Sequence, residues 1–291
     1  MKFVSQISKE LLFCSELQVR DYKKLLKCSY GETPNKLIFV ETICEILTKI
    51  TNKPIEYVKS LNIIDIFCLL LDIRATSAGP CKIVLSENDQ KLTIELNLNL
   101  IKKDTLELFQ GLSTTIEHNE IEIVFECPCM ERLLQTANDD YVSYIKGSYI
   151  TKNDTRKFIP INTNEQAELL FNKIPPKISL EIINKFNSFV EKITGMNFLS
   201  RYGIKNQQLI FVPSLDSLIW FTKLMFNEDL HSFYENIFHL SYTGKMSSEY
   251  VENLAVGEYN YFLGLLRQVI AAQNSSNSSS ENNSGLSEED M

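Results

Sequence analysis

The hydrophobic period of the chain changes at Gly79-Pro80, and this change limits the folds that the chain can adopt. From Asn62 to Arg74 the apolar residues are dense and suit a helix, whereas from Cys81 onward they alternate with polar residues. Alternation with a period of two predicts strands that have one face in water. The sequence therefore predicts an α+β protein in which helices and antiparallel strands occupy different parts of the chain.

The helix before this point has signals at both ends. Asn62 is expected to cap its start, with the acidic Asp65 at the third helical position near the positive end of the helix. The run from Ala75 to Pro80 supplies small residues, then glycine and proline, which end a helix. We expect Asp72 and Arg74 to lie at the solvated end of this helix.

Four segments after Gly79 are candidate strands of one small antiparallel sheet. The first two are expected to form a hairpin around a turn at Glu87-Asn88-Asp89, and the fourth is interrupted by Lys146-Gly147. The four segments are Cys81–Leu85, Lys91–Leu100, Ile121–Phe125 and Tyr141–Thr151.

Helical periodicity fills both ends of the chain. A helix after Pro34 is expected to bury Leu37, Val40, Cys44 and Leu47, which recur at spacings of three and four. The C-terminal part predicts a short strand at Leu209–Val212 and a series of helices. These helices cover Thr163–Asn172, a segment after Pro175-Pro176, a segment around Leu218–Met225 capped by Ser214 or Asp216, and Ser248 to Ile270.

The expected organisation is α+β, with helical N-terminal and C-terminal parts flanking a small central antiparallel sheet. The parts are a helical N-terminal part (1–80), a small antiparallel β-rich part (81–160), a helical C-terminal part (161–273) and a tail (274–291). The tail consists mainly of Ser, Asn, Gly and acidic residues, so it is expected to be disordered because it cannot bury enough apolar surface to offset its ordering entropy.

Composition disfavours several classes of partner. The net charge of -8 comes from 37 acidic and 29 basic residues, and no stretch of the sequence gathers the basic ones, so we expect no nucleic-acid binding. The seven cysteines are odd in number and several lie in apolar stretches, as in a reducing compartment. The longest apolar run, Ile63 to Ile73, is broken by aspartates and is shorter than the roughly 20 residues of a membrane span, so we expect no membrane insertion.

One pair of motifs is similar to a zinc-deaminase signature. His118-Asn119-Glu120 is followed by Pro128-Cys129, but the position of the second cysteine holds Arg132. A looser site would combine Cys127 and Cys129 with Cys81 or His118, although the C-x-C spacing is tighter than usual zinc spacings. The simpler interpretation is that one thiol faces the core and the other faces solvent. We therefore expect no metal and no cofactor.

The sequence also lacks the common catalytic motifs. It has three histidines and ten glycines, with no nucleophile elbow, Walker loop or dinucleotide glycine pattern. Asp65, Asp72 and Arg74 are interpreted as capping and solvated residues instead of an acid/base group. The aromatic residues Tyr259, Tyr261 and Phe262 are interpreted as core and rim, or as an interface, since no basic residues alternate with them. These observations favour a protein that is not an enzyme.

Two parts of the sequence carry a resemblance to a known family. The C-terminal part contributes Trp220-Phe221-Thr222-Lys223-Leu224-Met225-Phe226 and the segment around Glu258-Tyr259. The N-terminal part contributes Leu47-Thr48-Lys49, Pro54, Val58, Leu61, Asp65, Leu69-Leu70-Leu71-Asp72-Ile73-Arg74 and Ser77-Ala78-Gly79. With these residues the chain resembles the T-even-type bacteriophage baseplate hub protein family. The Ser/Asn-rich tail is a departure from it.

The resemblance implies a hub component of the contractile tail, or a chaperone-like factor for hub assembly, with no established catalytic residues. Its expected partners are other phage baseplate hub and tail proteins, met in the host cell cytoplasm during assembly or in the virion tail baseplate. The residues expected to bind a partner are Arg74, Ser77, Gly79, Trp220, Phe221, Tyr259 and Phe262.

Two other functions stay open at the level of sequence. One is a zinc-dependent nucleotide hydrolase or deaminase, suggested by His118, Glu120, Cys127 and Cys129. The other is an accessory protein of phage replication or transcription, which would bind a protein of that machinery and not the nucleic acid itself.

Overall fold

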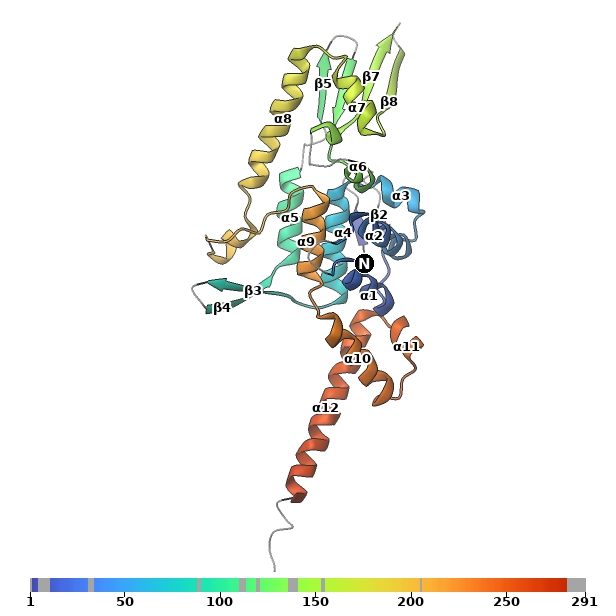
Figure 1. Ribbon diagram of the computed structural model, residues 1–291, viewed down its shortest axis with the longest axis vertical. Helices are drawn as coiled ribbons and strands as arrows, with labels where there is room; N and C mark the ends of the chain where they lie inside the picture. Colours follow the sequence, from blue (N-terminus) through green and yellow to red (C-terminus); the bar gives the residue numbers. More distant parts are fainter. Residues whose placement is uncertain are drawn as a thin grey trace, which may run out of the picture.

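A computed structural model gives the arrangement of the helices and strands (Figure 1). It describes residues 2–4, 11–30, 34–87, 90–109, 114–118, 121–135, 141–152, 155–204 and 206–281. The helices and strands form an elongated molecule with a helical body in the middle, a four-stranded sheet at one end and the last helix projecting from the other end (Figure 1). Among the described helices, none combines the length and the apolar content that crossing a bilayer requires.

The centre of the helical body is α4 (Ile63–Ser77), which is buried on every side from Ile63 to Arg74. A helix that is apolar all round needs neighbours on all sides. Asn62 caps α4 as predicted, because its side-chain oxygen accepts a hydrogen bond from the amide of Asp65 at 2.7 Å. The helices in contact with α4 include α5 (Leu98–Phe109), α9 (Leu215–Met225) and α12 (Val256–Glu281). The body also contains β1 (Lys2–Val4), β2 (Leu11–Phe13), α1 (Val19–Cys28), α2 (Lys36–Thr51) and α3 (Ile55–Ser60).

The predicted hairpin forms, but it is separate from the other strands. It consists of β3 (Cys81–Glu87) and β4 (Gln90–Leu96), which pair antiparallel; two of the three predicted turn residues, 88 and 89, lie outside the described part of the chain. The prediction that the second strand continues to Leu100 is wrong, since α5 begins at Leu98. Asn97 starts this helix by accepting a hydrogen bond from the Leu100 amide at 3.0 Å.

The second sheet is a four-stranded antiparallel meander with the strand order β5-β6-β7-β8. Its strands are β5 (Thr114–His118), β6 (Ile121–Phe125), β7 (Ile145–Lys152) and β8 (Thr155–Pro160), and α6 (Met130–Leu134) and the 3-10 helix η1 (Tyr141–Tyr144) lie between β6 and β7. The sequence indicated β6 and β7 but not β5 or β8. One small central sheet was expected, and the strands from β3 to β8 instead form two separate sheets, while β1 and β2 pair antiparallel in a third.

Two helices lie against the four-stranded sheet: α7 (Asn164–Phe171) and α8 (Pro176–Thr194) (Figure 1). The helix expected at Thr163–Asn172 forms, and Thr163 and Gln166 make a capping box at its start. Phe189 of α8 packs edge-on against Tyr144, with ring centroids 5.7 Å apart. This aromatic contact joins α8 to the loop between β6 and β7.

The chain returns to the helical body through η2 (Phe198–Tyr202) and the segment before α9. The segment Leu209–Val212 is not a strand, although its Leu209 carbonyl accepts a hydrogen bond from the Phe198 amide at 2.9 Å. Ser214, and not Asp216, caps α9, by accepting a hydrogen bond from the Ser217 amide. The remaining helices are α10 (Leu230–Tyr242), α11 (Ser248–Asn253) and α12 (Val256–Glu281).

The single last helix expected from Ser248 to Ile270 is two helices. They are interrupted because Leu254 and Ala255 pair with the N-terminal segment: Val19 donates a hydrogen bond to the Leu254 carbonyl at 2.9 Å, and Gln18 and Ala255 form a β-bridge. The second helix also runs further than expected. Residues 274–281, assigned to the tail, continue α12, while residues 282–291 lie outside the described part of the chain.

The α+β prediction, with helices at both ends of the chain and antiparallel strands in the middle, is confirmed. The division into parts at residues 80 and 160 stays a prediction. Buried residues of all three parts belong to one connected cluster, so the described core is continuous from Phe3 to Leu263.

Candidate functional site

Arg74 is buried near the C-terminal end of α4, where its guanidinium binds three backbone carbonyl groups. Nε donates to the oxygen of Met225 at 2.5 Å, Nη1 to that of Gly79 at 2.6 Å and Nη2 to that of Pro80 at 3.0 Å. Only 6% of the residue is exposed. The expectation that Arg74 lies in solvent is wrong, because the turn after α4 leaves carbonyls in the interior that a guanidinium can satisfy.

The neighbours of Arg74 are also turned inward. Asp72 is buried instead of solvated, and it accepts a hydrogen bond from Nζ of Lys102 on α5 at 2.5 Å. Ser77 is buried, and its hydroxyl oxygen lies 3.4 Å from the donating amide of Leu17. Of the three residues predicted to bind a partner here, Arg74 and Ser77 are buried and Gly79 is exposed. Gly79 has a φ of 69°, a backbone conformation that glycine adopts without strain.

The four aromatic residues predicted to bind a partner divide between the core and the surface. Phe221 and Tyr259 are buried, and Phe221 packs edge-on against Phe67 with ring centroids 5.0 Å apart. Phe262 is partly buried against the core. Trp220 is 47% exposed and lies edge-on to Phe221 at 5.1 Å. Trp220 is therefore at the surface, and its ring packs on the buried ring of Phe221.

A second exposed apolar group lies close to the helix that carries Trp220. Nζ of Lys36 forms an ion pair with Oδ2 of Asp216 at 2.8 Å, which joins the first turns of α2 and α9. Leu37 and Ile38, which follow Lys36, are each 54% exposed. We call Leu37, Ile38 and Trp220 the α2–α9 surface.

The sequence interpretation missed this surface because it placed Leu37 on the buried face of its helix. Asn35 caps α2, and its side-chain oxygen accepts hydrogen bonds from the amides of Leu37 and Ile38 at 3.0 and 3.1 Å. These two residues are therefore in the first turn, ahead of Phe39 and Val40, which begin the buried face. The signal that was available is the Pro-Asn pair before Lys36, since asparagine is a preferred cap residue.

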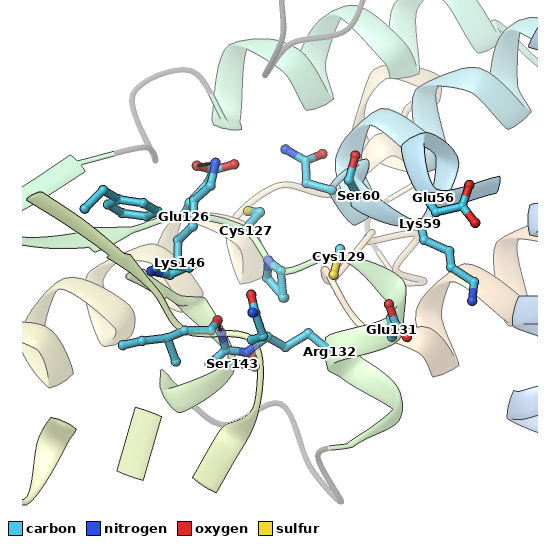
Figure 2. A pocket seen from close by; sticks show the side chains of 16 residues that line it. Glu56, Lys59, Ser60, Glu126, Cys127, Cys129, Glu131, Arg132, Ser143 and Lys146 are labelled. Carbon is cyan, nitrogen blue, oxygen red and sulfur yellow. Dashed lines mark hydrogen bonds and ion pairs between the residues drawn. The ribbon is translucent and has the colours of Figure 1, made fainter. Parts of the chain in front are cut away.

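The described part of the chain has a cavity of about 540 Å³ where α3 and α6 meet the four-stranded sheet (Figure 2). Two backbone contacts join the body to the sheet here: the Ile63 amide donates to the Pro128 carbonyl at 3.0 Å, and Asn62 and Cys129 form a β-bridge. Nζ of Lys146 forms an ion pair with Glu126 at 2.7 Å on the cavity wall.

Arg132, which stands where a zinc deaminase would have a cysteine, has a structural role at this cavity. Its guanidinium donates hydrogen bonds to the carbonyl oxygens of Ile161 and Val142, the latter at 3.0 Å. Burial lowers the pKa of the guanidinium, and the two carbonyls offset part of the cost of burying it. Arg132 therefore connects α6 to the segment just before β7 and to the segment just after β8.

The two cysteines of the C-x-C pair have different surroundings. Cys127 is buried and burial raises the pKa of its thiol well above the usual value, whereas Cys129 is partly exposed on the cavity wall (Figure 2). Both cysteines line the cavity, Cys127 as a buried residue and Cys129 as a partly exposed one, and the interpretation that only one of the two thiols faces the core stays a prediction. Cys81, the third thiol considered, belongs to the separate β3–β4 hairpin.

The other residues of the zinc hypothesis cannot be placed around these thiols. Glu120 and the side chain of His118 lie outside the described residues. Within the part that the structure describes, no three or more His, Cys, Asp or Glu side chains are grouped as a metal ion would require.

Comparison with known proteins places the chain in a family. Residues 2–203 match the model of the family described as T4 bacteriophage base plate protein. Neither the curated proteins nor the solved structures contain a significant match. Since the family match covers more than half of the 291 residues, this chain belongs to the T4 bacteriophage base plate protein family and has a structural or assembly role in the phage baseplate.

Proposed function

We propose that the chain acts at the central hub of the baseplate, either as a hub component or as a chaperone-like assembly factor, and that it binds other hub proteins through the α2–α9 surface. The hub assignment is supported by the resemblance of Leu47–Gly79 and Trp220–Phe226 to the T-even-type hub family. The binding mode is supported by one observation: Trp220 is 47% exposed and yet held by its edge-on contact with Phe221.

A half-exposed tryptophan that packs on a buried ring suits protein binding for two reasons. Tryptophan is enriched among the residues that contribute most to interface energies, because it buries a large area with few rotatable bonds. A partner that covers Trp220 would also cover the exposed Leu37 and Ile38 if its footprint extends across the Lys36–Asp216 ion pair. Exposed apolar side chains together with a solvent-accessible ion pair are a combination that protein interfaces contain.

The test is co-expression of the full chain with the hub proteins of the same phage, followed by affinity purification. The wild type should retain at least one of them. The amount of hub protein retained by Trp220→Ala should be lower by about tenfold or more, as expected for a tryptophan at the centre of an interface. Tyr242→Ala is the matched control, since Tyr242 is an aromatic residue of α10 with 76% exposure, outside the proposed surface.

Several outcomes would contradict this function. A wild-type chain that retains no hub protein, or that retains replication or transcription subunits in their place, would remove the hub assignment. Equal loss in Trp220→Ala and Tyr242→Ala would remove the assignment of the surface. Mass spectrometry of purified virions and of infected-cell lysate then separates the two roles, because a component is present in the particle and an assembly factor is found only in the lysate.

A further inference from the structure

The guanidinium of Arg132 is a buried positive charge whose hydrogen-bond acceptors are neutral. They are the carbonyl oxygens of Ile161 and Val142 and the side-chain oxygen of Asn164, the last at 3.4 Å. Only 6% of Arg132 is exposed. Within the part of the chain that the structure describes, no carboxylate forms an ion pair with it. Buried charges in proteins are usually paired with an opposite charge, so the Arg132 charge calls for a partner.

Arg132 borders the cavity between the helical body and the four-stranded sheet, and Figure 2 shows it on the side opposite Ser60. The cavity volume of about 540 Å³ lies within the range of sites that bind small ligands, which is roughly 300–1,000 Å³. A guanidinium has more N–H donors than three acceptors occupy. Part of the donor capacity of Arg132 is therefore left for a ligand in this cavity.

Asn62 contributes a second unused donor to the same cavity. It is 8% exposed, and its side-chain oxygen accepts the hydrogen bond from the Asp65 amide that caps α4. This bond identifies the oxygen end of the side-chain amide, so the other end is the Nδ2 group. Among the described residues Nδ2 has no hydrogen-bond acceptor. A buried N–H donor without a partner costs free energy that an acceptor in the cavity would recover.

The other charged groups of the cavity leave the guanidinium charge unbalanced. Glu126 is already paired with Lys146, at 2.7 Å. Glu56 and Glu131 also line the cavity but are exposed, and Lys59 is half-buried. Carboxylates at the exposed edge repel anions that have several charges, so a singly charged anion fits the cavity better.

Much of the remaining cavity wall is apolar and includes Pro128, Phe158 and Pro160. We propose that the cavity binds an organic carboxylate. Arg132 donates hydrogen bonds to the carboxylate, and Nδ2 of Asn62 donates to an oxygen of the same ligand. The apolar part of the ligand packs against Phe158 and the two prolines. A guanidinium matches the planar geometry of a carboxylate, and the ligand supplies the negative charge that Arg132 lacks.

This inference does not rest on the proposed hub function, because the residues of the cavity are separate from the α2–α9 surface. Each can therefore fail without the other. A carboxylate of this kind can belong to a free small acid or to the C-terminus of a partner polypeptide. Both present the same group to Arg132, and the experiment separates them.

The test is an NMR titration of the full-length protein with N-acetylleucine, which combines a carboxylate, an amide and an apolar side chain. The matched probe N-acetylleucinamide lacks the charge, and inorganic phosphate lacks the apolar part. We expect saturable binding of N-acetylleucine, with affinities for the two other probes that are lower by about tenfold or more. N-acetylalanylalanylleucine should bind with the same affinity as N-acetylleucine if the natural ligand is a small acid, and more tightly if it is a chain terminus.

Asn62→Asp is the decisive variant. Aspartate caps a helix as well as asparagine does, so α4 should remain capped, but the Nδ2 donor is replaced by a negative charge. The affinity for N-acetylleucine should fall by about tenfold or more. Asn35→Asp is the matched control, because it makes the same change at the cap of α2, outside the cavity, and should bind like the wild type.

Arg132→Gln should lose binding in the same way, with circular dichroism to verify folding. If this variant fails to fold, Asn62→Asp decides the result. The proposal is overturned if the wild type does not bind N-acetylleucine, or binds its amide or phosphate equally well. It is also overturned if Asn62→Asp, or a folded Arg132→Gln, binds N-acetylleucine as the wild type does, since the ligand then lies elsewhere on the chain.

Discussion

Nε of Arg74 donates a hydrogen bond to the carbonyl oxygen of Met225 at 2.5 Å, and these two residues are 151 positions apart in the sequence. This contact fixes the end of α4 against the end of α9. Together with the hydrogen bonds to Gly79 and Pro80, it turns the Arg74 guanidinium toward the chain's own backbone.

Arg74→Met should destabilise the protein by about 3 kcal/mol, because it leaves buried carbonyl groups without donors. The change is measured as the free energy of unfolding in urea. Arg20→Met, at an exposed position of α1, should change it by less than about 0.5 kcal/mol. If Arg74→Met weakens partner binding but leaves stability unchanged, Arg74 acts at an interface as the sequence suggested.

A chain that ends at residue 203, where the family match ends, should not fold cooperatively. Phe67 of α4 stacks on Phe211 with ring centroids 3.8 Å apart and meets Phe221 edge-on at 5.0 Å, and both partners lie beyond residue 203. Losing one such ring costs about 3–5 kcal/mol, so losing several exceeds a stability of about 5–15 kcal/mol. Thermal unfolding followed by circular dichroism measures this.

The matched truncation ends at residue 273. It removes residues 274 and 275, which are exposed, and the rest of the Ser/Asn-rich segment, so its melting temperature should equal that of the full chain. A chain of residues 1–203 that unfolds with a sharp transition would show that the C-terminal helices are not needed for the core.

Gly147→Ala should destabilise the four-stranded sheet by about 2 kcal/mol or more, because the added carbon overlaps its neighbours. It would lie 2.5 Å from the Phe158 ring and 2.6 Å from the Ile159 carbonyl oxygen. Gly257→Ala on α12 meets no atom within 4 Å and is the control. Urea unfolding of the two variants measures the difference, and equal stability would mean that Phe158 moves aside freely.

A maleimide should label one cysteine rapidly in the folded chain, and that cysteine is Cys129. It is partly exposed, whereas the other six cysteines are buried, and burial raises the pKa of Cys28 to about 12 and that of Cys44 to about 11. The thiolate is the reactive form, so buried thiols of high pKa react slowly at pH 8. Mass spectrometry should find one label per folded chain and none in Cys129→Ser, and labelling of a second thiol at a similar rate would contradict the burial.

Glu228→Gln should stabilise the protein more at pH 7.5 than at pH 4.5. Burial raises the pKa of the Glu228 carboxyl above its usual value, although Tyr22 and Asn236 donate hydrogen bonds to it. A carboxyl with a raised pKa in the folded state holds its proton there to higher pH, so stability is lost as the pH rises from the unfolded value through the folded value. Glutamine does not ionise, so the melting temperature of Glu228→Gln should exceed that of the wild type by a margin that grows as the pH rises from 4.5 to 7.5.

The control for this prediction is Glu249→Gln, at an exposed position of α11. A melting-temperature difference between Glu228→Gln and the wild type that does not change with pH would mean that Glu228 does not lose solvation on folding.

Local sequence signals were sufficient to predict the features of this fold that depend on residues close together in the sequence. The cap at Asn62 and the β3–β4 hairpin follow from such signals, and the cap of α9 was limited to Ser214 or Asp216, because the donors and acceptors involved are at most a few residues apart. The helices at both ends and the strands between them, and hence the α+β class, follow in the same way. The absence of recognised catalytic motifs also pointed to a structural protein, which the family match supports.

Contacts between distant segments account for what local signals missed. Arg74 is buried because the carbonyl of Met225 folds onto it, and the last helix is split because Leu254 and Ala255 pair with the chain near Gln18. Trp220 faces solvent and Phe221 the core because α9 packs on α4 through the Phe67 ring. A helical pattern states that an apolar face will be covered, but the segment that covers it, and the side chains left exposed, depend on packing energies summed over the whole fold.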